Sequence, residues 1–187
     1  MGRLIAYNFV SLNGFFKGPN EDISWHKHAA DESKYSEEML ALDNILLFGR
    51  KTYESMASFW PTPMAQNMFP KVAEGMNRAE KIVISNSAPK EEPWHNSRFI
   101  QGNVVDQIRS IKQAYSKDIT ILGSGSIINL FTDHAMIDEY QIMIDPVGLP
   151  AGTSLFNGIS QAINLTLIDV KRFPSGVVLL CYSRSLT

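Results

Sequence analysis

The sequence predicts an α/β protein with a mostly parallel central sheet and an antiparallel pair of strands at its C-terminal end. Short apolar runs alternate with segments whose apolar residues recur at helical spacing, and glycine, proline or asparagine separates them. This alternation favours a parallel sheet that is covered by helices on both faces. The last two apolar runs, Asn164–Phe173 and Val177–Arg184, are joined only by Pro174-Ser175-Gly176, which is typical of a hairpin.

The first half of the chain begins with a strand and a helix. Arg3–Ser11 is apolar and ends at the turn signal Asn13-Gly14, which indicates a buried first strand. Tyr35, Met39 and Leu42 lie on one helical face, so we expect a helix over Ala29–Leu42. The elements expected next are a strand at Asn44–Phe48, a helix from Thr52 to the Trp60-Pro61 break, a shorter helix over Ala65–Gly75 and a strand at Lys81–Ile84.

The second half repeats the alternation. Arg98–Ile100 is a brief strand, and Asn103 is placed to cap a helix that continues through Val104, Ile108, Ile111 and Tyr115. The elements expected after it are a strand at Ile119–Leu122, a helix through Ile127 and Phe131, and a strand at Ile137–Ile144. Since no linker or repeat interrupts this pattern, we expect a single domain over residues 1–187.

Composition excludes several classes of function. A net charge of −2 without runs of like charge argues against nucleic acid or membrane surfaces as partners. The chain shows no signal-like stretch and no apolar run near the ~20 residues of a spanning helix, which favours a cytoplasmic protein. Cys181, the only cysteine, lies in an apolar run and predicts a buried side chain rather than a nucleophile. The histidines His26, His28, His95 and His134 lack metal-ligand spacing, so we expect no metal site and solvated loop or cap positions.

Three predicted strand-to-helix junctions have the residues of a phosphate site. They are Gly49-Arg50-Lys51-Thr52, Ser85-Asn86-Ser87 and Gly123-Ser124-Gly125-Ser126. Ligands of parallel α/β sheets bind beyond the carboxyl ends of the strands, where helix N-termini offer unpaired N–H groups. Each junction alone can be a tight turn with a helix cap, but the three together favour a nucleotide crevice. A standard Rossmann fingerprint is disfavoured, because Ile128 stands where its third glycine belongs.

The motifs and their order resemble the dihydrofolate reductase superfamily. Leu47–Ser55 resembles its Gly-Arg-x-Thr motif, and Ile121–Ser126 is similar to its glycine-rich cofactor turn. Ile137–Tyr140 and Asp145–Phe156 look like the riboflavin-biosynthesis reductase branch, the C-terminal domain of RibD. The resemblance extends from Arg3 to about Arg184 and implies a dihydrofolate reductase-like three-layer fold. Ser124 departs from the paired glycines of folate reductases, which favours the riboflavin branch.

The resemblance implies NADPH as cofactor. It would place Arg50 at the 2′-phosphate, Thr52 at the pyrophosphate and Ser85 near the adenosine. The turn formed by Gly123, Ser124, Gly125 and Ser126 would complete the pyrophosphate site, and Gly49 would be a further cofactor-binding residue. Lys51 is added on the ground of its charge alone.

The substrate side is less well defined by the sequence. Folate reductases hold the pterin with an acidic residue on the first helix, a few residues after a tryptophan, and Trp25 and Asp31 could be the counterparts. Asp31 shares a helical stripe with Tyr35, but Glu38 has the same bearing, and Glu32 is a weaker choice. No threonine occurs in residues 139–144, which counts against dihydrofolate itself. Phe59 and Trp60 could equally line the pocket or fill the core.

These observations favour an NADPH-dependent reductase that transfers hydride to a small pterin- or pyrimidine-like heterocycle, with a water or Asp31 as proton source. The alternative is a nucleotide-binding module without turnover, since no proton donor is unambiguous. Similarity to the riboflavin branch also implies a homodimer, with Pro146–Gly152 as a plausible contact. The loop from Asn13 to His28 either closes over the nicotinamide end as a lid or is pinned to the core by Phe15, Phe16 and Trp25.

Overall fold

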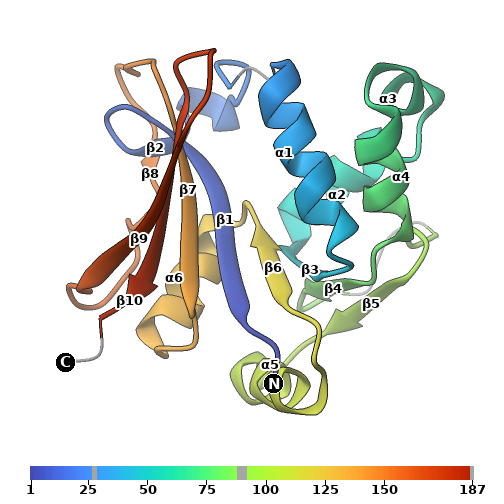
Figure 1. Cartoon of the computed structure of the whole chain (residues 1–187). Helices are drawn as coiled ribbons and strands as arrows, with labels where there is room; N and C mark the ends of the chain where they lie inside the picture. The colour runs from blue at the N-terminus through green and yellow to red at the C-terminus, as the bar shows by residue number, and fades with distance from the viewer. Residues whose placement is uncertain (27–28, 88–91, 186–187) are drawn as a thin grey trace.

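The central sheet determines where every functional segment lies. The computed structural model describes residues 1–26, 29–87 and 92–185. Its large sheet has eight strands in the order β5-β4-β3-β6-β1-β7-β10-β9 (Figure 1). The strands are β1 (Leu4–Ser11), β3 (Ile45–Gly49), β4 (Lys81–Ile84), β5 (Ser97–Ile100), β6 (Ile119–Leu122), β7 (Glu139–Asp145), β9 (Leu165–Arg172) and β10 (Val178–Arg184). From β5 to β7 all neighbours are parallel, and β10 is antiparallel to both β7 and β9. The predicted sheet with its antiparallel hairpin is confirmed.

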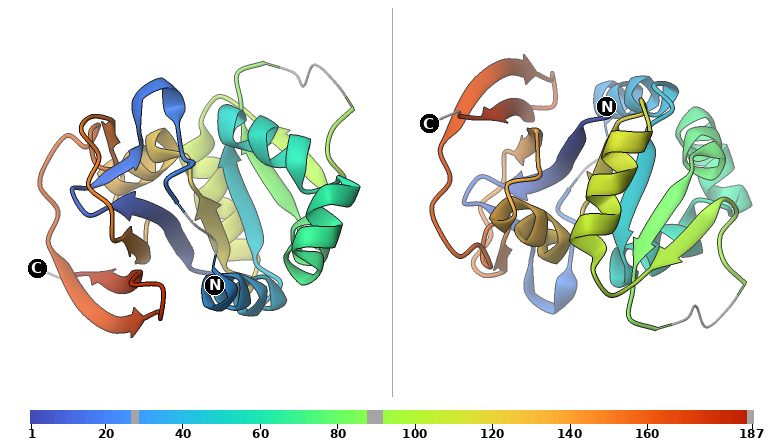
Figure 2. Two further views of the ribbon diagram at one scale, coloured as in Figure 1. Left: turned by 90° about the horizontal axis from the view of Figure 1, so that it is seen from above. Right: turned by 90° about the horizontal axis from the view of Figure 1, so that it is seen from below.

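Helices cover both faces of the sheet and complete a three-layer fold (Figure 2). They are α1 (Ala30–Ala41), α2 (Arg50–Phe59), α3 (Pro63–Met68), α4 (Pro70–Arg78), α5 (Val104–Ala114) and α6 (Gly125–Asp133). On one face, α5 and α6 bury Ile108, Ile128 and Phe131 against β1, β3 and β6. On the other face, α2 and α4 bury Tyr53 and Met76 against β3 and β4. The sheet therefore has two apolar faces, and helices cover each of them.

Two local features differ from the expected elements. The helix expected over residues 65–75 is two helices, because Phe69 leaves helical geometry at φ −138° and Pro70 starts a new helix. A second, two-stranded sheet pairs β2 (Phe15–Lys17) with β8 (Thr153–Ser154), and a short 3-10 helix, η1 (Pro19–Glu21), follows β2. Strands this short carry no periodic signal in the sequence.

Cys181 is buried on β10, as expected, and burial raises the pKa of its thiol to about 11.

Within the described ranges, no helix combines the length and the apolar character needed to cross a bilayer.

Candidate active site

A cavity of about 1290 Å³ opens at the carboxyl ends of β1, β3 and β6. Residues from β1, β2, α1, α2 and α6 form its walls, together with the segments that follow β3 and β6. It lies where ligands of parallel α/β sheets bind, and at the end of the sheet where two of the three predicted junctions meet.

Ser124 joins these two junctions. Its hydroxyl accepts a hydrogen bond from the Gly49 amide at 2.9 Å and donates one to Thr52 Oγ1 at 2.8 Å. The junctions can meet because β3 and β6 are neighbouring parallel strands. Gly123 and Ser124 both have left-handed backbones, with φ +59° and +57°, and a Cβ on Gly123 would lie 3.3 Å from Thr52 Cγ2. Gly123 is thus required by both its conformation and its close approach to α2.

The N-cap residues of α2 and α6, Gly49 and Ser124, line the cavity, and neither makes a side-chain capping hydrogen bond to its own helix in the described residues. By contrast, Thr62 caps α3 and Asn103 caps α5 through side-chain oxygen atoms. Uncapped N-termini leave backbone N–H groups and a partial positive charge directed outward. This arrangement fits a pyrophosphate, and it is the property that the glycine-containing junctions predicted.

Cationic side chains surround these helix ends. Arg50 is exposed at the start of α2 and lies 3.0 Å from Glu54, while Lys51 Nζ lies 3.3 Å from Glu21 Oε1. Lys17 of β2 contacts the same Glu21 oxygen at 2.6 Å, and these two lysines lower the pKa of Glu21, Lys17 more strongly. The pairs are exposed to solvent, so an incoming phosphate can replace them at little cost.

Ser85 lies outside the cavity wall, although its neighbour Ile84 contributes to it. The Ser85 side chain is buried, and its hydroxyl donates to the carbonyl of Ser87 at 2.8 Å and accepts from the amide of Ser87 at 3.2 Å. The third junction is therefore a locally satisfied turn, which is the simpler of the two interpretations that its sequence allowed.

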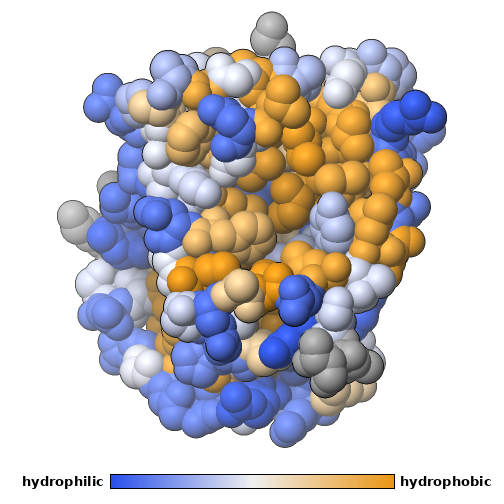
Figure 3. Space-filling model, turned by 90° about the vertical axis from the view of Figure 1, so that its left-hand side faces the viewer, coloured by the Kyte–Doolittle hydropathy of each residue, from blue (hydrophilic) through white to orange (hydrophobic). Residues whose placement is uncertain are grey.

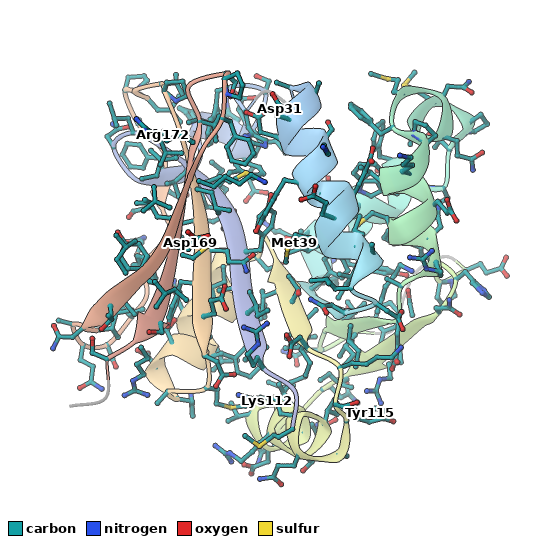
Figure 4. The ribbon with its side chains drawn as sticks, viewed as in Figure 1. Asp31, Met39, Lys112, Tyr115, Asp169 and Arg172 are labelled. Carbon is teal, nitrogen blue, oxygen red and sulfur yellow. The ribbon has the colours of Figure 1, made fainter. Side chains whose placement is uncertain are left out.

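The expected inward orientation of Asp31 is wrong. Asp31 is exposed at the start of α1 and does not line the cavity, whereas Met39, further along the helix, does (Figure 4). Glu32 is the buried carboxylate: Ser175 donates to its Oε1, and its Oε2 has no partner among the described residues. The stripe predicted through Tyr35 and Leu42 does not face the core along its whole length, because Leu42 is 62% exposed beyond the end of the helix.

Trp25 does not line the cavity either. Its indole meets the ring of Phe9 edge-on at 5.6 Å, and Nε1 donates to the carbonyl of Asp22.

Phe16 lies directly over the glycine turn, since a Cβ on Gly125 would come within 2.7 Å of its ring. Phe59 and Trp60 both line the cavity. The last two residues of the expected lid, including His28, lie outside the described residues, and closure of this loop stays a prediction.

His26 is the site residue that sequence reasoning missed. Its side chain is 4% exposed, not solvated as expected, and it lines the cavity. The ring stacks on Phe9 at 3.8 Å with an interplanar angle of 5°, and Nδ1 lies 2.9 and 3.0 Å from the two carboxylate oxygens of Asp145. Because 119 residues separate the two partners, no local pattern could have indicated the pair. His95 and His134 are exposed, as expected.

The inner wall of the cavity is largely uncharged. α1 contributes Ser33, Ser36 and Met39, and β1 contributes Tyr7 and Asn8. Asn8 is 2% exposed, and its amide nitrogen has no hydrogen-bond partner among the residues that the structure describes. A buried donor of this kind usually has a partner, so a ligand with an acceptor atom would satisfy it.

Comparison with known proteins agrees with this architecture. The model of the RibD C-terminal domain matches residues 3–179. The chain belongs to this family. It is therefore a member of the dihydrofolate reductase-like superfamily, in the RibD C-terminal branch.

Known relatives of this domain match the chain along nearly its whole length. The protein YyaP of Bacillus subtilis is 28% identical over 180 residues, which cover 96% of this chain and 94% of YyaP. A deaminase and 5-amino-6-(5-phosphoribosylamino)uracil reductase from Thermotoga maritima has the same fold, with a TM-score of 0.71 and 16% identity over 98% of this chain and 57% of that protein. Dihydrofolate reductase from Enterococcus faecalis, solved with NADP(H), gives a TM-score of 0.68 and 16% identity over 98% of this chain and 96% of the reductase.

Proposed function

We propose that this protein is an NADPH-dependent reductase that transfers hydride to a small, planar heterocycle of the pterin or pyrimidine type. The observation that carries the proposal is the pair of uncapped helix N-termini, joined by Ser124 and flanked by Arg50 and Lys51, at the mouth of an apolar cavity. A dinucleotide with an additional phosphate needs this combination of oriented N–H groups and cations.

The residues of the two junctions would hold the cofactor. Arg50 would take the 2′-phosphate, with Lys51 beside it, because both cations are exposed and their partners among the described residues are surface carboxylates. The pyrophosphate would lie over the N-terminus of α6, against Gly49, Thr52, Gly123, Ser124, Gly125 and Ser126. We assign no role to Ser85. When bound, NADPH supplies the hydride, and the protein aligns it and excludes water.

The inner wall favours an uncharged substrate. No carboxylate of α1 lines the cavity in the described residues, since Asp31 points to solvent. Hydroxyl and amide groups of Ser33, Ser36 and Asn8 are available instead, and they suit ring carbonyls and ring nitrogens rather than a cationic pyrimidine.

The proposal is tested with the purified protein in two measurements. Quenching of tryptophan fluorescence gives the affinities of NADPH and NADH, and absorbance of NADPH follows turnover with a panel of pterins, pyrimidines and flavins. We expect tighter binding of NADPH and oxidation with at least one heterocycle. Binding of NADPH without turnover on any member would instead support a non-catalytic nucleotide-binding module. Failure to bind NADPH would refute both.

A further inference from the structure

His26 lines the cavity and contacts the buried carboxylate of Asp145, and neither residue belongs to the two glycine-containing junctions proposed to hold the cofactor. His26 comes from the segment before α1, and Asp145 is the last residue of β7. Both side chains are 4% exposed, and the imidazole is close to both carboxylate oxygens. The contact is shielded from bulk water, so its hydrogen bonds do not compete with solvent.

Asp145 and Phe9 fix the orientation of the imidazole. A carboxylate at Nδ1 favours a proton on that nitrogen, and in the imidazolium form Nε2 carries the second proton, which is the one that can be donated. Stacking on Phe9 at 3.8 Å sets the plane of the ring. A histidine held in this way at a cavity wall has the arrangement of a general acid.

Among the described residues, the neighbouring titratable groups do not offer an alternative donor. Tyr7 lines the same wall, but burial raises the pKa of its phenol, and the charges of Asp145 and Glu32 raise it further. Glu32 is buried on α1, and its carboxylate accepts a hydrogen bond from the hydroxyl of Ser175. The other charged side chains that line the cavity are Lys17, Glu21, Arg50, Lys51 and Asp133, which belong to β2, η1, the start of α2 and the end of α6.

We propose that His26 is the proton donor of the reduction and that Asp145 is its positioning residue; this inference rests on the proposed reductase function. Hydride adds to the carbon of a C=N or C=O bond of the substrate, and the π electrons of that bond move to the heteroatom. The heteroatom takes the proton from Nε2, which leaves His26 neutral until solvent returns a proton. The substrate gains two electrons and two hydrogens, one as hydride from the dihydronicotinamide and one as a proton from His26.

The test compares His26→Gln and Asp145→Asn with His95→Gln, which removes an exposed histidine. With the heterocycle that the wild type reduces, we expect His26→Gln to lower kcat about 100-fold or more. Asp145→Asn should lower it less. Both variants should change the Kd for NADPH less than about two-fold, because neither residue belongs to the two junctions that are proposed to bind the cofactor. His95→Gln should leave both quantities unchanged.

Two further readouts separate proton donation from a purely structural role. The pH dependence of kcat should be lost in His26→Gln and shifted in Asp145→Asn. Imidazole added to His26→Ala should restore part of the turnover, since the space beside Phe9 then accepts it. Equal kcat in wild type and His26→Gln would overturn the proton donor while the reductase proposal survives. A wild type that binds NADPH and reduces no heterocycle would overturn both.

Discussion

Replacing Ser124 with alanine tests whether one hydroxyl joins the two glycine-containing junctions, Gly49–Thr52 and Gly123–Ser126. The substitution removes the acceptor of the Gly49 amide and the donor to Thr52, at 2.9 and 2.8 Å. An amide that loses its partner costs about 1–3 kcal/mol, and a lost neutral hydrogen bond costs about 0.5–1.5 kcal/mol. Because the cavity lets water reach part of this site, we expect a loss near the lower end, about 2 kcal/mol in the free energy of unfolding.

Ser124→Gly provides the matched control. It removes the same two hydrogen bonds but relieves the left-handed backbone at φ +57°, a conformation that costs a residue with a side chain about 1–2 kcal/mol. We therefore expect Ser124→Gly to lose only about 1 kcal/mol. Urea unfolding measures both values, and the slope of each transition should match that of the wild type. A loss below about 0.5 kcal/mol in Ser124→Ala, or equal losses in the two variants, would refute this reasoning.

Four further outcomes are expected. Arg50→Ala should weaken NADPH binding by about 1.5–3 kcal/mol and hardly affect NADH, and equal losses would contradict its assignment to the 2′-phosphate. Burial lowers the pKa of Lys81 from 10.5 to about 8; between these values the unfolded chain binds more protons, so this lysine makes the free energy of unfolding rise with pH. Comparing urea unfolding of wild type and Lys81→Met across that range isolates the effect, and parallel pH dependences would refute it. β9 exposes the apolar side chains of Leu167, Ile168 and Val170, and apolar residues gather on one side of the molecule (Figure 3). Light scattering should therefore give a homodimer that Ile168→Lys dissociates, and a wild-type monomer at micromolar concentration contradicts this. Amide exchange in residues 13–26 should slow when NADPH and a substrate analogue are both bound, whereas no change would indicate a fixed loop.

The junctions were predictable because their position follows from topology. Parallel strands place their carboxyl ends at one edge of the sheet, so glycine-containing segments after two such strands must lie near each other. Gly49 and Gly123 could therefore be assigned to one site from the sequence. The bridge made by Ser124 could not, because it depends on β3 and β6 being adjacent, and strand order is not encoded in local periodicity.

The substrate side was not predictable for two different reasons. Successive helix positions differ by about 100°, so an error of one residue exchanges the buried Glu32 for the exposed Asp31. α1 has few apolar residues with which to fix that phase. His26 and Asp145 meet only because a loop after β2 folds back against the end of β7, and loops carry function without a periodic signal. The proposed proton donor thus depends on a long-range contact between His26 and Asp145, which no local pattern indicates, whereas the proposed phosphate site depends on glycine-containing turns that the sequence shows directly.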